Sequence, residues 1–192
     1  MRLVIAALVF FSSFYSFSMT GLEVGQKVPE LSLKDTKGEK VDFNNNPKTI
    51  VAIFFRGSWC PYCVKQLKTV EDDLVKKVGE NVEIVAISVD KLSVAKKMKN
   101  QFKFSFQVIS DPLAKSLKAF KIINKLDDSL VQKYKASYKI DVEGDSGQTH
   151  HMVAHPAVFI IKNGKIAYAD IHVNYKERTK NSEILKKLQL VK

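Results

Sequence analysis

The sequence contains few cysteines, which could cross-link the chain, and few prolines, which could interrupt helices or form linkers between domains. It has two cysteines and five prolines among 192 residues, and two cysteines can form only one disulfide, which excludes a disulfide-rich scaffold. No second Cys-x-x-Cys pair is present to complete the four ligands of a structural zinc site. Because no Pro/Ser-rich linker or internal repeat interrupts residues 19–192, we expect them to form one domain.

Arginine is also scarce, and this scarcity argues against a nucleic-acid partner. The formal net charge is +11 at pH 7, but only three of the 31 basic residues are arginines. Lysine is a hydrated point charge that reads phosphates and bases poorly. The lysines are scattered rather than gathered in a stripe with aromatic residues. We expect a solvated basic surface that at most steers acidic partners or attracts anionic lipid weakly.

The first 18 residues have the pattern of a secretory signal peptide. One early positive charge, Arg2, precedes an apolar stretch that ends in the small residues Ser16 and Ser18. The stretch is shorter than the roughly 20 apolar residues that a membrane-spanning helix needs, and no second candidate span follows it. We therefore expect residues 1–18 to be removed, the mature protein to be periplasmic or secreted, and no stable membrane association after cleavage.

The two cysteines lie close together, in a Trp-Cys-Pro-Tyr-Cys motif at residues 59–63. The apolar, β-branched run at 49–55 predicts a buried parallel strand just before them. Apolar residues then recur every three or four positions from Val64 to Leu74, which predicts a helix over about 61–77. The pair is therefore expected at the beginning of a helix, where its two sulfurs can form and break a disulfide with little backbone movement.

That position changes the chemistry of the sulfurs. Free backbone N–H groups and the helix dipole favour an anion, so Cys60 should be the more acidic thiol. Pro61 suits the first helical position, and Trp59 and Tyr62 should flank the sulfurs with flat apolar surface. A redox-active Cys60–Cys63 pair is the leading interpretation. Alternatives are inert thiols, half of a zinc site, or a structural disulfide, although closing so short a loop stabilises little.

The remaining pattern predicts an α/β fold in which a mixed central sheet is flanked by helices. Parallel strands joined by helices are followed by a terminal antiparallel hairpin, for which Asn163-Gly164 is the turn. The expected elements are a β-hairpin at 31–33 and 41–43, strands at 81–89 and 106–109, helices at 93–101, 113–120, 127–138 and 181–189, a loop at 141–148, and a hairpin at 157–161 and 165–169.

This order of elements, the cysteine motif, and a proline that opens the strand before the Asn-Gly hairpin together resemble the thioredoxin fold. The likeness covers residues 22–190. In that fold the proline before the third core strand is cis and packs beside the dithiol. The resemblance therefore implies that His155-Pro156 is this cis-proline element, with 121–152 as an insertion before its strand.

A closer resemblance rests on residues 54–63, together with Val89-Asp90 and Ser110-Asp111-Pro112. These segments resemble the peroxiredoxin-like branch of the alkyl hydroperoxide reductase and thiol-specific antioxidant family, and the N-terminal hairpin also fits that branch. The resemblance implies an oxidoreductase or antioxidant enzyme with a thiol reductant as its partner and no cofactor.

Peroxiredoxins proper carry a Pro-x-x-x-Thr-x-x-Cys motif and a distant arginine, which hold peroxide against the thiolate. On that motif Cys63 takes the peroxidatic position, Cys60 replaces the threonine and Arg56 replaces the proline. The only other arginines are Arg2 and Arg178, so we expect the distant arginine to be missing. Arg56 either supplies a positive charge near the sulfurs or is a structural or surface residue at a strand end.

Three activities are compatible with these residues, and the first is our prediction. In a thiol–disulfide oxidoreductase, Cys60 attacks a protein or small-molecule disulfide and Cys63 resolves the mixed disulfide. In a peroxidase, Cys63 becomes a sulfenic acid and Cys60 condenses with it. In a copper-binding protein, His150, His151 and His155 join the two thiolates, although loop histidines more often only solvate a loop. We expect no metal site.

Overall fold

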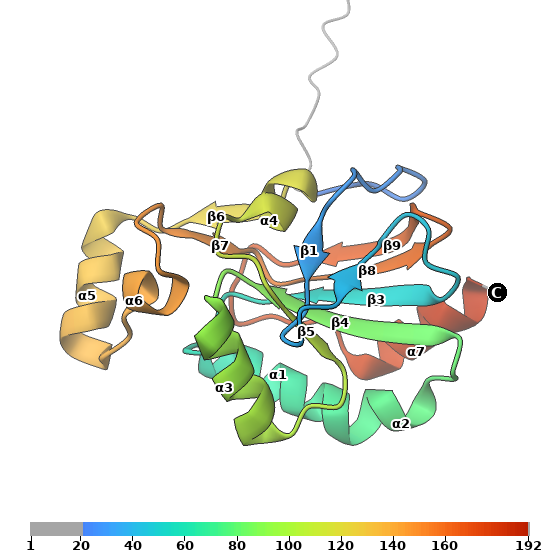
Figure 1. Cartoon of the computed structure of the whole chain (residues 1–192), viewed down its shortest axis with the longest axis horizontal. Coiled ribbons are helices and arrows are strands. Elements are labelled where there is room, and N and C mark those ends of the chain that lie inside the picture. The colour runs from blue at the N-terminus through green and yellow to red at the C-terminus, as the bar shows by residue number, and fades with distance from the viewer. Residues whose placement is uncertain (1–20, 192) are drawn as a thin grey trace, which may run out of the picture.

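The computed structural model describes residues 21–191, so the predicted signal peptide lies outside the described residues. A five-stranded sheet with the order β5-β4-β3-β8-β9 forms the centre (Figure 1). Strands β3, β4 and β5 run parallel, whereas β8 and β9 are antiparallel to their neighbours, which confirms the predicted mixed sheet. The strands are β3 Thr49–Phe54, β4 Val82–Ser88, β5 Gln107–Ser110, β8 Ala157–Lys162 and β9 Lys165–Ile171.

Strand β3 is buried on both faces, as its continuous apolar sequence predicts for a central parallel strand. Ala52 and Phe54 belong to one core cluster, and Val51 and Ile53 belong to the other. Alternation along a strand sends neighbouring side chains to opposite faces of the sheet, so β3 contributes to both cores.

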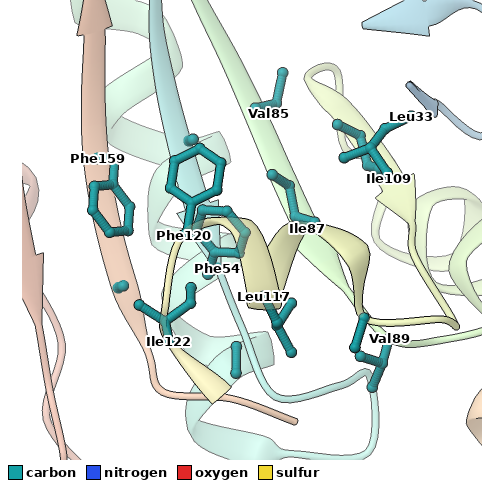
Figure 2. Packing of buried hydrophobic residues seen from close by; sticks show 14 of the residues in the cluster. Leu33, Phe54, Val85, Ile87, Val89, Ile109, Leu117, Phe120, Ile122 and Phe159 are labelled. Atoms are coloured by element: carbon teal, nitrogen blue, oxygen red, sulfur yellow. The ribbon is translucent and has the colours of Figure 1, made fainter. Parts of the chain in front are cut away.

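Helices α1 Pro61–Thr69, α3 Leu92–Phe102 and α7 Asn181–Leu190 cover the face that includes the cysteines. The opposite face is covered by α4 Lys115–Ala119 and by the short hairpin of β1 Leu33–Lys34 and β2 Lys40–Val41 (Figure 1). Three phenylalanines pack together on this second face (Figure 2). The ring centroids of Phe54 and Phe120 are 4.8 Å apart, and those of Phe120 and Phe159 are 5.0 Å apart.

The helix that carries the cysteines is less regular than its sequence predicts. The structure divides the expected helix into α1, a π-helical turn η1 Val70–Leu74, and α2 Val75–Lys77. The wider turn keeps both Val70 and Leu74 fully buried in the core that contains Cys63. The apolar spacing therefore predicts the buried face correctly but not the local change in helix type.

The terminal hairpin confirms the Asn-Gly turn. Asn163 and Gly164 both have positive φ, 51° and 71°, as a two-residue turn between β8 and β9 requires. A Cβ atom on Gly164 would lie 2.9 Å from the carbonyl oxygen of Asn44, so glycine is required here for space as well as for conformation.

The insertion at 121–152 contains more regular structure than expected. Helix α5 Asp128–Tyr138 confirms the predicted helix, but the predicted loop at 141–148 contains the short helix α6 Val142–Ser146. Asp141 caps α6 by accepting a hydrogen bond from the Gly144 N–H at 2.9 Å. The antiparallel pair of β6 Ile123–Lys125 and β7 Met152–Ala154, which was not predicted, ties the base of the insertion together.

The expectation of a cis peptide bond at His155-Pro156 is wrong, because residues 21–191 contain no cis peptide bond. With the bond trans, the His155 N–H donates to the carbonyl oxygen of Ile122 at 2.8 Å, and the Pro156 carbonyl accepts from the His172 N–H at 2.9 Å. The chain thus passes from β7 into β8 with hydrogen bonds on both sides of the proline. Since Ala157 pairs with Phe54, Pro156 still lies at the edge of the sheet from which the cysteine loop begins.

Across residues 21–191, no helix combines the length and the apolar character that crossing a membrane would demand.

Phe120 should be a main contributor to stability, because its buried ring contacts Phe43, Phe54 and Phe159. Phe120→Ala should lower the free energy of unfolding by about 3 to 5 kcal/mol, through lost burial and a cavity. Leu190→Ala, at a side chain that is 74% exposed, is the control and should change it by less than about 0.5 kcal/mol. Urea unfolding measures both, and equal losses in the two variants would contradict this description of the core.

Candidate functional site

The two cysteines begin helix α1, as predicted. Cys60 is the residue before the helix, with φ −88° and ψ 113°, and Pro61 is the first helical residue. The Cys60 carbonyl accepts hydrogen bonds from the N–H groups of Cys63 and Val64, both at 3.0 Å. Both thiols are free, and both are buried, at 1% exposure for Cys60 and 0% for Cys63. Cys60 is therefore almost as inaccessible as Cys63.

The loop before the cysteines is held by a buried carboxylate. Asp90, which follows β4 and is 1% exposed, accepts hydrogen bonds through Oδ2 from the Ser58 N–H at 2.8 Å and the Ser88 hydroxyl at 2.9 Å. Burial raises the pKa of Asp90 to about 7. Gly57 is required in this loop because a Cβ atom there would lie 2.3 Å from Nε1 of Trp59. Sequence reasoning did not assign Asp90 to the site, although a charged residue ending an apolar strand was a usable signal.

The expectation that no distant arginine reaches the sulfurs is wrong, because Arg178 contacts both. Its Nη2 lies 3.1 Å from Cys63 Sγ and 4.0 Å from Cys60 Sγ. Its Nη1 donates to the carbonyl oxygens of Tyr175 and Glu177, at 2.6 and 2.5 Å, which fixes the guanidinium. The segment between β9 and α7 therefore returns to the beginning of α1 and places a cation on the dithiol.

Arg56 is both a structural residue and a source of positive charge near the sulfurs, the two roles that the sequence had left as alternatives. It is only 3% exposed, so it is not a surface residue. Its guanidinium carbon lies 4.8 Å from the ring centroid of Trp59 and 4.7 Å from that of Tyr175, and its Nη2 donates to the Tyr134 hydroxyl at 3.1 Å. Aromatic faces attract such a cation. Held there, its positive charge also lowers the pKa of Cys60.

The pKa values of the two thiols are shifted in opposite directions. Hydrogen bonds from the side chain and backbone of Cys63, with the charges of Arg56 and Arg178, outweigh burial and lower the pKa of Cys60 to about 6. Burial, together with the neighbouring Cys60, raises the pKa of Cys63. The negative charge of the pair therefore resides on Cys60, in the direction expected from the helix N-terminus.

The aromatic residues that flank the pair differ in exposure. Tyr62 is 41% exposed, and its ring centroid lies 6.0 Å from that of Tyr175. Trp59 is half-buried, with its ring centroid 5.7 Å from that of Tyr134. Trp59 thus links the cysteine loop to helix α5 of the insertion, whereas Tyr62 offers an accessible surface between the cysteines.

The histidines do not converge on the sulfurs. Nε2 of His150 bonds with the Pro112 carbonyl at 2.8 Å, and His151 lies between Asp128 and Glu143, at 2.9 and 2.7 Å. Burial lowers the pKa of His155, whose Nδ1 has no partner in the described part of the chain. Residues 21–191 hold no group of three or more His, Cys, Asp or Glu side chains placed to bind a metal ion, so the geometry lends the copper-binding alternative no support.

Curated relatives match part of the chain. Thiol-disulfide oxidoreductase ResA of Bacillus thuringiensis subsp. konkukian is 26% identical over 113 residues, which are 58% of this chain and 65% of that protein. Thioredoxin-like protein YneN of Bacillus subtilis is 26% identical over 130 residues, which are 68% of this chain and 72% of that protein. The chain thus spans just under two thirds of the length of the first of these relatives.

Solved structures match a larger part of the chain than the curated relatives do. A peroxiredoxin-like protein from Aquifex aeolicus superposes with a TM-score of 0.70 at 19% identity, over 90% of this chain and 89% of that one. Peroxidoxin BcpB from Mycobacterium tuberculosis gives 0.67 at 16% identity, over 89% and 99% of the two chains. These likenesses establish the thioredoxin-like fold. The AhpC/TSA family itself matches residues 24–169, which include the cysteine motif and all of the central sheet except the last two residues of β9, and the chain belongs to that family.

Proposed function

We propose that this protein is a thiol–disulfide oxidoreductase whose redox-active pair is Cys60 and Cys63. The observation that carries the proposal is the opposite acidity of the two neighbouring thiols at the beginning of α1. A thiolate is the nucleophile in disulfide exchange, and a low pKa makes it available near neutral pH. The named activity of the ResA relatives agrees with this assignment.

The reaction follows from the positions of the sulfurs. The Cys60 thiolate attacks one sulfur of a substrate disulfide, a mixed disulfide forms, and the departing thiolate takes up a proton. The Cys63 thiol then loses its proton and attacks Cys60 Sγ, which releases the second substrate thiol and closes the Cys60–Cys63 disulfide. Two electrons pass from the dithiol to the substrate, and a thiol reductant partner returns them.

Arg178 and Arg56 have complementary parts in this reaction. Arg178 lies within 4.0 Å of both sulfurs and favours the anion on whichever sulfur carries it. Arg56 acts on Cys60 by charge while aromatic rings hold it in place. The Arg178 charge also opposes the burial that raises the pKa of Cys63, which favours the Cys63 thiolate that resolves the mixed disulfide.

A thiol peroxidase is the second candidate, and one observation favours it. Arg178 lies closest to Cys63, the sulfur at the peroxidatic position, and so supplies the cation that such a site needs. In that reaction Cys63 attacks peroxide and becomes a sulfenic acid, and Cys60 condenses with it as water leaves. The raised pKa of Cys63 argues against this order of events.

For the whole protein, we propose export after removal of residues 1–18, on the basis of their sequence pattern. A periplasmic or secreted location would supply disulfide substrates, because oxidising compartments allow them to persist.

Separate substitution of the cysteines distinguishes the two candidates. Cys60→Ser and Cys63→Ser should each abolish catalytic reduction of insulin disulfides, but only Cys63→Ser should trap a substrate as a stable mixed disulfide, visible by mass spectrometry. The reason is that only Cys60 makes the first attack. Hydrogen peroxide consumption much faster than that of free cysteine, lost in Cys63→Ser and retained in Cys60→Ser, would instead establish the peroxidase.

Removal of the Arg178 charge should make Cys60 less acidic. In the wild-type protein the thiolate forms as the pH rises through about 6, so the rate of disulfide exchange should fall below that pH. Arg178→Gln should move this midpoint to higher pH, and Arg178→Lys should move it less because the charge is kept. Thiolate absorbance against pH measures the midpoint. An unchanged midpoint in Arg178→Gln would show that the contact has no electrostatic effect on the pair.

A further inference from the structure

A pocket of about 490 Å³ lies beside the dithiol, between α1 and the segment that carries Arg178. This volume is in the range of small-ligand sites. Tyr62, the residue just before Cys63, lines one side, and Arg178, whose Nη2 contacts Cys63 Sγ, lines the other. Neither cysteine lines the pocket, so a molecule bound here lies next to Arg178 and Tyr62 and not against the sulfurs themselves.

The charged residues that line this pocket are all cations. They are Lys65, Lys176, Arg178 and Lys180. The three lysines are exposed, and within residues 21–191 none of them forms an ion pair with a carboxylate. Free ammonium groups on both walls of one pocket make it a site for an anion rather than for a neutral or cationic group.

The acidic residues near the pocket are already engaged elsewhere. Asp73 pairs with Lys77 and accepts from Asn181 Nδ2 at 3.1 Å, and Asp170 accepts from the Thr179 hydroxyl at 2.8 Å. Glu177 accepts from Asn174 Nδ2 at 2.8 Å. These carboxylates do not line the pocket, so they leave its lysines available to an incoming carboxylate.

Gln66 gives the pocket a second, independent feature. This residue of α1 is only 7% exposed, and its Oε1 is buried with no hydrogen-bond partner in the described part of the chain. A buried acceptor left unpaired is costly, and a donor from a ligand would remove that cost once the Gln66 side chain turns its oxygen into the pocket. Amide oxygens accept hydrogen bonds from N–H groups, which a peptide provides and a simple inorganic anion does not.

We propose that this pocket binds the peptide arm of a disulfide substrate that carries carboxylates, with its carboxylates on Lys65, Lys176 and Lys180 and an N–H group on Gln66 Oε1. The inference rests on the proposed function, and it names the substrate class of the same site. The Cys60 thiolate attacks the substrate sulfur, the first substrate thiolate leaves and is protonated, and Cys63 releases the second with closure of the Cys60–Cys63 disulfide.

The test measures how the reduced protein acts on three different disulfides. Oxidised glutathione carries carboxylates on a peptide, its tetramethyl ester has the same skeleton without carboxylates, and hydroxyethyl disulfide has neither peptide nor charge. Oxidised glutathione should have a KM about tenfold below that of its ester at low salt, and the difference should shrink as salt screens the lysines.

Matched variants locate the effect. Lys65→Gln/Lys180→Gln should bring the KM values of oxidised glutathione and its ester within about twofold of each other. Lys96→Gln/Lys133→Gln removes the same charge from exposed positions on α3 and α5 and should leave the ratio unchanged. Gln66→Leu should raise the KM of both peptide disulfides relative to that of hydroxyethyl disulfide.

The outcomes separate this inference from the proposed function. Reduction of all three disulfides with equal KM values, or an equal response in both double variants, would overturn the pocket assignment and leave the oxidoreductase intact. Failure of the dithiol to reduce any of the three would overturn the proposed function, and the pocket assignment with it.

Discussion

The chemistry of this site depends on the contact between two buried sulfur atoms, which hydrogen-bond to each other and share a guanidinium group. Burial alone would keep both thiols protonated, because a low-dielectric surrounding disfavours a thiolate. Hydrogen bonds from the side chain and backbone of Cys63, together with the charges of Arg56 and Arg178, reverse that effect for Cys60, whereas the pKa of Cys63 stays raised. The pair is thereby divided into a nucleophile and a resolving thiol, although its two members are nearly equal in exposure.

The fold provides this contact from segments far apart in the chain. The cysteine loop follows β3, the central strand of the sheet. Asp90, just after the neighbouring strand β4, holds that loop by accepting a hydrogen bond from the Ser58 N–H. The segment after β9 places Arg178 beside the sulfurs, although Arg178 and Cys60 are 118 residues apart in the sequence. Because both sulfurs are buried, a substrate reaches Cys60 only after residues around the pair move.

The parts of the site that follow from local patterns could be predicted from the sequence, and the parts that depend on distant contacts could not. The apolar run of β3, the apolar spacing of α1 and the Asn163-Gly164 turn each encode their structure within a few residues. Arg178 gave no local signal, and the scarcity of arginine led to the wrong expectation that no distant arginine reaches the sulfurs. Helix α6 was missed because its stability comes from the Asp141 cap and burial rather than from helix propensity.

The central claim is that Cys60 and Cys63 exchange electrons as one pair, and a redox titration of the wild-type protein tests it most directly. After equilibration in a series of thiol–disulfide buffers, alkylation and mass spectrometry count the free thiols at each potential. The account predicts a single two-electron transition in which both thiols become unreactive together. Two thiols that remain alkylated from the most reducing to the most oxidising buffer would contradict it.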